Sequence, residues 1–177
     1  MNLHHLLNVR RAAGKPVRVA LIGAGKFGSM FLSQVPHTPG LEIPVIVDLD
    51  PQRAREACRT VGWDAERVAT TTFTADGTKA EVGNIEIVVE ATGNPAVGIR
   101  HARAAIAAGK HIVMVNVEAD ALAGPLLVEE ARKAGVVYSL AYGDQPALTS
   151  EMVDLGACHR ISRRRGREGH QILAGLS

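Results

Sequence analysis

Three glycines with the spacing Gly-x-Gly-x-x-Gly follow an apolar run near the start of the chain. Residues 17–22 form the run, and Gly23, Gly25 and Gly28 follow it. Gly23 would permit a sharp turn, Gly25 would let a pyrophosphate approach, and Gly28 would let a helix pack closely on the strand. Free N–H groups and the helix dipole favour an anion at such a helix N-terminus. The spacing therefore predicts a phosphate-binding strand, turn and helix.

The two residues inside this pattern, Lys26 and Phe27, are included in the predicted cofactor site. A second apolar, β-branched stretch covers residues 42–47, and Asp48 follows it, 20 positions after Gly28. A carboxylate at this place would accept hydrogen bonds from an adenosine ribose and would favour NAD by repelling a 2′-phosphate. Arg53 and Lys26 are close enough in sequence to leave NADP open. The alternative role for Asp48, a surface helix cap, fits the combined pattern less well.

Further candidates follow the later apolar stretches. Ala91, Thr92 and Gly93 would place small residues beside the cofactor, and the amide of Asn116 could meet the nicotinamide or its ribose. For Thr92 and Asn116, ordinary turn chemistry is an equally good explanation. The sequence predicts a cofactor contact at each of these positions and leaves the alternative open.

Carboxylates after strand ends could serve in acid–base chemistry or bind a divalent ion. They are Glu118, Asp120, Asp144 and Glu151. Glu118 is the catalytic candidate, although a charge at the start of the next helix explains it equally well, and explains Asp120 better. The histidines His37, His101 and His111 have no evident partner, so we expect structural roles for them. No metal site and no Ser-His-Asp set is predicted.

The elements that would position these residues alternate between strands and helices, which is typical of a doubly wound α/β sheet, mostly parallel, of the Rossmann type. Strands are predicted at residues 17–22, 42–47, 85–91, 111–117 and 136–141, with a doubtful one at 70–73. Helices are predicted at residues 2–13, 29–35, 51–61, 95–108 and 122–134. The stretch 63–83 shows the weakest pattern of helices and strands, and residues 79–82 are predicted to lie on the surface.

Composition agrees with one globular domain. Of 177 residues, 46% are hydrophobic and 3% aromatic, so the core must consist of Val, Ile, Leu and Ala. The cysteines, Cys58 and Cys158, form no metal or redox spacing, and no apolar run is long enough for a membrane span or a secretory signal. These features predict a cytoplasmic protein without a membrane partner.

Basic charge is concentrated at the C-terminal end. Residues 155–177 contain five arginines and one acid, whereas the first 154 residues carry 15 basic and 17 acidic groups. We therefore divide the chain into a dinucleotide-binding domain, residues 1–154, and an aberrant tail, residues 155–177, expected to be disordered. The tail lacks the interleaved aromatic residues of a nucleic-acid-binding arm, so no nucleic-acid partner is expected.

Four segments resemble the homoserine-dehydrogenase-like oxidoreductases, and within them the branch of the deoxyxylulose-phosphate reductoisomerase-like enzymes. The segments are residues 21–31, 89–95, 115–120 and 142–146. The resemblance implies NAD(P)-dependent hydride transfer on a small carbonyl or alcohol substrate, a catalytic domain after the Rossmann domain, and often a C-terminal SAF domain. It leaves open the substrate, a divalent metal in the full-length enzyme, a homo-oligomer, and a reductoisomerase acting on a sugar phosphate.

The chain departs from this family after Asp154. Family members continue with Gly-Lys-Gly-Thr-Lys-Tyr-Leu-Pro, whereas residues 169–177 can be encoded by bases that, read one position later, give Gly-Thr-Lys-Tyr-Leu-Pro-Ala-Tyr. We predict that residues 155–177 are the out-of-frame product of a single-base insertion or sequencing error, so that the catalytic domain is absent. An intact reading frame across this junction in the gene would contradict the prediction.

Overall fold

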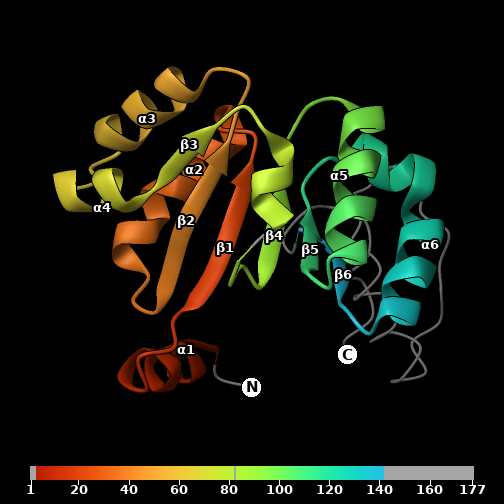
Figure 1. Ribbon diagram of the computed structural model, residues 1–177, viewed down its shortest axis with the longest axis horizontal. Helices are drawn as coiled ribbons and strands as arrows, with labels where there is room; N and C mark the ends of the chain where they lie inside the picture. Colours follow the sequence, from red (N-terminus) through yellow and green to blue (C-terminus); the bar gives the residue numbers. More distant parts are fainter. Residues whose placement is uncertain (1–2, 82, 142–177) are drawn as a thin grey trace, which may run out of the picture. The chain divides into compact units, whose positions relative to one another are not determined.

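The computed structural model describes residues 3–81 and 83–141 (Figure 1). Several features singled out in the sequence lie outside the described residues. They are the segment 142–146 with Asp144, then Glu151, Cys158 and the predicted tail at 155–177.

A six-stranded sheet with the order β3-β2-β1-β4-β5-β6 forms the centre of the fold (Figure 1). Its strands are β1 Val17–Ile22, β2 Leu41–Val47, β3 Thr72–Thr74, β4 Ile87–Glu90, β5 His111–Met114 and β6 Tyr138–Leu140. Every neighbouring pair of strands is parallel. The strand order reverses between β1 and β4, which creates the crevice where doubly wound sheets bind ligands. The predicted doubly wound α/β fold is confirmed.

Helices cover both faces of this sheet. The covering helices are α2 Lys26–Gln34, α3 Pro51–Thr60, α4 Ala65–Thr70, α5 Pro95–Ala107 and α6 Val117–Ala134, with the 3₁₀ turns η1 Val35–His37 and η2 Gly77–Glu81, whereas α1 Leu3–Ala12 precedes β1. On one face Leu32, Ala54 and Val68 from α2, α3 and α4 join a buried cluster with residues of β1 and β2. On the other face α5 and α6 pack on the sheet through Ala102 and Leu127. The predicted core of Val, Ile, Leu and Ala is present on both faces, and it also contains Cys58, Trp63 and Met114.

The stretch with the weakest pattern, residues 63–83, contains more structure than predicted. Asp64 accepts a hydrogen bond from the Arg67 backbone N–H and so caps the short helix α4, which the sequence did not indicate. The doubtful strand exists but is shifted to Thr72–Thr74. The expectation of surface at 79–82 is wrong for Ala80, which is fully buried between the sheet and α5 because η2 turns it inward.

The second difference concerns the strand predicted at 111–117 and the helix predicted at 122–134. The strand β5 ends at Met114, and α6 begins at Val117, five residues before the predicted start. The cause is Asn116, whose Oδ1 accepts a hydrogen bond from the Ala119 N–H at 3.0 Å and caps the helix. Glu118 and Asp120 therefore lie in the first turn of α6, where the helix dipole favours acidic residues.

Within the described ranges, no helix is long and apolar enough to cross a membrane. Cys58 is fully buried on α3, and burial raises the pKa of its thiol to about 11, so it is protonated at neutral pH. A buried, protonated thiol agrees with the sequence, in which Cys58 has no metal or redox spacing.

Candidate dinucleotide-binding site

The glycine turn after β1 is packed too closely for side chains at two of its three glycines. Gly23 has φ +97°, and a Cβ there would lie 2.7 Å from the carbonyl oxygen of Ala91. A Cβ at Gly28 would collide with the carbonyl oxygen of Gly23. The turn therefore lies against the residue that follows β4, and α2 lies against the turn, as the spacing of the glycines predicted.

Gly25 differs, because the space beside it is open. A Cβ at Gly25 would meet nothing within 4 Å, and the residue is the N-cap of α2, with no side chain of the described residues capping that helix. Lys26 is exposed at the first position of α2, whereas Phe27 is partly buried against the core beneath it. The first turn of α2 thus offers backbone N–H groups to an open space, a geometry that fits a pyrophosphate.

Asp48 directly follows β2 and is bound to the glycine turn. Its Oδ2 accepts a hydrogen bond from the Ala24 N–H at 2.8 Å. Its Oδ1 accepts from the Asp50 N–H and from Nη2 of Arg53, both at 2.9 Å. Burial alone would raise the pKa of Asp48, but these hydrogen bonds and the Arg53 charge outweigh burial and lower it. Asp48 is therefore an ionised carboxylate fixed between the end of β2 and the glycine turn.

The residue after Asp48 carries the most exposed large apolar side chain of this edge. Leu49 is 97% exposed. Asp50, next in sequence, accepts a hydrogen bond from the Arg53 N–H and caps α3, which begins with Pro51 at the predicted residue 51. The end of β2 thus combines a fixed carboxylate, an apolar surface and an exposed guanidinium.

A second carboxylate, Glu90, ends β4 and was missed in the sequence. Its side chain is fully buried, and its Oε1 accepts hydrogen bonds from both the backbone N–H and the hydroxyl of Thr92. Nδ1 of His101 lies 3.5 Å from the same oxygen. One feature of the sequence could have identified Glu90: it is a charged residue at the end of an apolar strand, directly before the loop of Ala91, Thr92 and Gly93.

The other oxygen of Glu90 faces α5. Among the described residues, Oε2 has no hydrogen-bond partner, and a Cβ at Gly98 would lie 2.9 Å from it. The same Cβ would lie 3.1 Å from Nδ2 of Asn116. Gly98 therefore creates the space in which Glu90 and Asn116 are buried together.

Asn116 joins the ends of β4 and β5. Its Nδ2 donates to the Thr92 carbonyl at 2.8 Å while its Oδ1 caps α6, and only 4% of the residue is exposed. Both of its polar atoms are engaged in the structure, so the turn-chemistry alternative describes the observed geometry. A cofactor contact by Asn116 stays a prediction, as it does for Ala91, Thr92 and Gly93.

The two carboxylates in the first turn of α6, Glu118 and Asp120, lie in different environments. Glu118 is exposed in the first helical turn. Asp120 accepts a hydrogen bond from the Tyr138 hydroxyl at 2.8 Å, and burial together with this bond raises the pKa of Tyr138. His111 accepts the Val137 N–H through Nδ1, which is a structural role as expected. The catalytic role of Glu118 stays a prediction.

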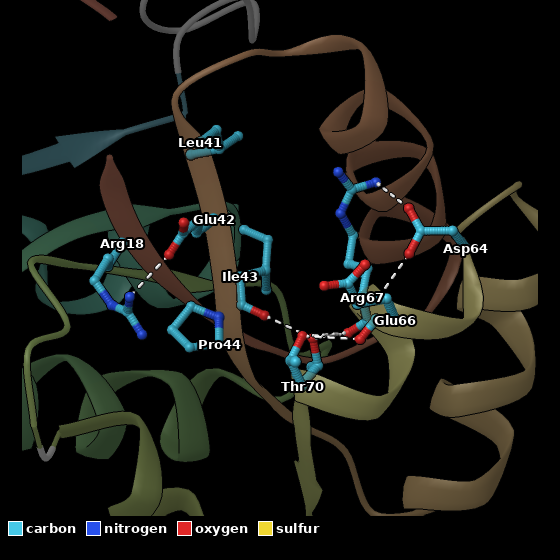
Figure 2. A pocket seen from close by; sticks show the side chains of 10 residues that line it. Arg18, Leu41, Glu42, Ile43, Pro44, Asp64, Glu66, Arg67 and Thr70 are labelled. Carbon is cyan, nitrogen blue, oxygen red and sulfur yellow. Dashed lines mark hydrogen bonds and ion pairs between the residues drawn. The ribbon is translucent and has the colours of Figure 1, made fainter. Parts of the chain in front are cut away.

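The cavity drawn in Figure 2 lies away from the glycine turn, between the first half of β2 and α4. Two ion pairs line it, Arg18 with Glu42 and Arg67 with Asp64 (Figure 2). Its cations are thus matched by carboxylates, and the cavity adds nothing to the site at the carboxyl ends of the strands. In residues 3–81 and 83–141, no group of three or more His, Cys, Asp or Glu side chains could hold a metal ion.

Comparisons with solved structures support the fold. A homoserine dehydrogenase from Thiobacillus denitrificans is 24% identical with a TM-score of 0.60, over 71% of this chain and 29% of that one. A biliverdin reductase from Synechocystis, solved with biliverdin and NADP⁺, is 18% identical with a TM-score of 0.59, over 81% of this chain and 43% of that one. The chain therefore spans less than half the length of these two structures.

No curated protein sequence matches the chain. A family model does match, and it covers residues 17–142, which include the whole sheet and both strand-end carboxylates. Its description is "Oxidoreductase family, NAD-binding Rossmann fold". The chain belongs to this GFO_IDH_MocA family of oxidoreductases.

Proposed function

We propose that this chain binds NAD(P) at the glycine turn, as the dinucleotide-binding domain of an oxidoreductase. The observation that carries the proposal is the open space beside Gly25, between closely packed Gly23 and Gly28. This space faces the first turn of α2, where a pyrophosphate would be held by backbone N–H groups. Asp48 would hold the adenosine end, and the exposed Leu49 offers an apolar surface for the purine ring.

When bound, the nicotinamide would supply the hydride chemistry, between its ring and a carbonyl or alcohol carbon of a small substrate. The residues of this chain would bind and orient the cofactor. The loop of Ala91, Thr92 and Gly93 would lie beside it, held by Glu90 and Asn116. Glu118 is the one proposed acid–base group, because it is exposed at the carboxyl end of the sheet, two residues after Asn116.

The finer proposals rest on the sequence resemblance. They are a homoserine-dehydrogenase-like oxidoreductase of open substrate, a reductoisomerase acting on a sugar phosphate with a divalent metal, and a nucleotide-binding fragment without turnover. The origin of residues 155–177 in a shifted reading frame also stays a proposal. Binding of cofactor without turnover would favour the fragment.

The substitution Gly25→Val tests the site directly. Because a Cβ at residue 25 meets nothing and the residue has a negative φ of −71°, the variant should fold normally. Its side chain would occupy the pyrophosphate space, so we expect it to abolish the binding of NADH and NADPH in a fluorescence titration. Ala65→Val, at the exposed first position of α4, is the matched control and should leave binding unchanged.

Two results would contradict the proposal. One is a wild-type protein that binds neither NADH nor NADPH. The other is unchanged affinity in Gly25→Val, which would place the cofactor elsewhere. Thermal unfolding of both variants checks that a lost signal reflects the site and not the fold.

A further inference from the structure

The carboxylate of Glu90 is a buried negative charge that no basic side chain matches. The side chain is fully buried, and within residues 3–81 and 83–141 no lysine or arginine forms an ion pair with it. Its one neighbour that can carry a positive charge is His101, whose Nδ1 lies 3.5 Å from Oε1. Because protein and not water surrounds this carboxylate, its charge is weakly screened.

The contacts of Glu90 fit an ionised carboxylate. The N–H and the hydroxyl of Thr92 both donate to Oε1, and hydrogen bonds to a charged acceptor are stronger than those to a neutral one. The charge also acts beyond these contacts. Burial and the hydrogen bond to Asp120 raise the pKa of Tyr138, and the charges of Asp120 and Glu90 raise it further. The charge of Glu90 is therefore felt as far away as β6.

Glu90 lies directly beneath the loop that borders the proposed cofactor site. A Cβ on Gly23 would lie 2.7 Å from the carbonyl oxygen of Ala91 and 3.0 Å from the nitrogen of Thr92. The N–H of Thr92 in turn donates to Oε1 of Glu90 at 3.2 Å. The glycine turn, the loop after β4 and Glu90 are thus in consecutive contact. A dinucleotide held at the glycine turn and extended along this loop would lie over the buried charge.

We infer that Glu90 makes this site favour the oxidised form of the cofactor, because the oxidised nicotinamide ring carries a positive charge and the reduced ring is neutral. The inference rests on the proposed cofactor site. The pyrophosphate and both riboses are the same in the two forms, so an effect of Glu90 on them cancels in the ratio of the two affinities. That ratio therefore isolates the interaction between Glu90 and the nicotinamide ring.

The test compares the dissociation constants of NAD⁺ and NADH, measured by isothermal titration calorimetry on the full chain and its variants at one ionic strength. NADP⁺ and NADPH replace this pair if the wild type binds them more tightly. Glu90→Gln removes the charge, while its carbonyl oxygen can still accept both Thr92 hydrogen bonds. We expect the affinity for NAD⁺ to fall about tenfold relative to that for NADH.

Glu86→Gln is the matched control for Glu90→Gln. Glu86 directly precedes β4, at the end opposite to Glu90, and it pairs with Arg10. Its replacement removes a carboxylate of the same strand segment far from the loop after β4. The ratio of the two affinities should therefore stay at the wild-type value.

A second variant adds a positive charge and leaves Glu90 in place. His101 lies on α5 with 22% of its side chain exposed, so a lysine at this position can keep its ammonium group near solvent. His101→Lys should lower the affinity for NAD⁺ relative to NADH about threefold or more, because the new cation offsets the carboxylate. The neutral His101→Gln is its matched control and should not change the ratio. All titrations are done at pH 8, above the usual titration range of histidine.

The outcomes separate this inference from the proposed function. An unchanged ratio in Glu90→Gln would overturn the inference and leave the cofactor site standing. Equal weakening of NAD⁺ and NADH would also overturn it, because Glu90 would then act only by holding the loop. If thermal unfolding shows that Glu90→Gln does not fold, the ratio in His101→Lys against His101→Gln decides in the same way. A wild type that binds neither form would overturn the proposed function, and the inference with it.

Discussion

Two carboxylates flank the glycine turn, and they are held in opposite ways. Asp48 follows β2 and Glu90 ends β4, the two strands that lie on either side of β1. Each accepts a hydrogen bond from the backbone N–H two residues later, that of Asp50 or of Thr92. Beyond this shared turn, Asp48 bonds an exposed arginine, whereas Glu90 is enclosed by Thr92, His101 and Gly98.

This difference indicates different roles. The partner of Asp48 can be exchanged for a ligand, because Arg53 is exposed to solvent. Glu90 has no exposed surface, and the groups around it belong to the loop after β4 and to α5. We therefore expect Asp48 and Arg53 to recognise the adenosine end of the cofactor. We expect Glu90 to be a positioning residue, which shapes the loop expected beside the nicotinamide end.

The largest effect should come from Glu90→Ala. It would leave the N–H and hydroxyl of Thr92 without their acceptor and open a cavity, which together should lower the free energy of unfolding by about 2–4 kcal/mol. Glu90→Gln should cost less, because its carbonyl oxygen can still accept both Thr92 hydrogen bonds. Urea unfolding monitored by circular dichroism measures both effects.

Glu42→Ala is the control for this comparison. Glu42 is a partly exposed glutamate in an ion pair with Arg18, and its removal should change stability by no more than about 1 kcal/mol. If Glu90→Ala lowered the stability no more than Glu42→Ala, the enclosed Glu90 would contribute no more to the fold than an exposed glutamate in an ion pair, contrary to what its geometry indicates.

The second prediction concerns Gly98, which makes room for Glu90. Replacing glycine by alanine inside a helix normally stabilises a protein by up to about 1 kcal/mol. Here we expect the opposite sign, a loss of about 1 kcal/mol or more, because the new Cβ would lie 2.9 Å from Oε2 of Glu90 and 3.1 Å from Nδ2 of Asn116. The free energy of unfolding of Gly98→Ala in urea measures the sign.

A double-mutant cycle identifies the cause of that loss. In the Glu90→Ala background the obstructing carboxylate is gone, so Gly98→Ala should become less harmful or stabilising. Additive effects of the two substitutions would mean that Gly98 is required for another reason, such as its contact with Asn116.

The contrast between the two carboxylates also explains what the sequence could predict. The glycine turn, the parallel sheet and Asp48 were predictable because their signals are local: glycine spacing, apolar runs and an acid 20 positions after Gly28. Glu90 was not, because its neighbours Gly98, His101 and Asn116 come together only when α5 and α6 pack on the sheet.

The start of α6 shows the same limit at the level of secondary structure. Val115 and Val117 are β-branched and extend the apolar pattern of β5, so the strand was predicted to continue through residue 117. The Asn116 side chain decides otherwise, since it caps the helix and bonds the Thr92 carbonyl, which belongs to another strand end. A tertiary hydrogen bond thus accompanies the cap, and no local pattern reveals that bond.

The smallest effect should be the contribution of Asp48 to acid stability. Hydrogen bonds lower the pKa of Asp48 in the folded protein, whereas an unfolded aspartate titrates near ~3.9. Between these two pKa values the unfolded chain binds more protons, so stability rises with pH. The contribution is present above about pH 4 and is lost as the pH falls through the folded pKa.

Urea unfolding from pH 7 to pH 3 should therefore show a smaller loss of stability with falling pH in Asp48→Asn than in wild type. Arg53→Gln removes one of the three donors and should give an intermediate slope. If Arg53→Gln and Asp48→Asn gave the same slope of stability against pH, Arg53 would account for most of the stabilisation by ionised Asp48. A slope equal to wild type in Arg53→Gln would assign the stabilisation to the backbone N–H groups and leave Arg53 available to a ligand.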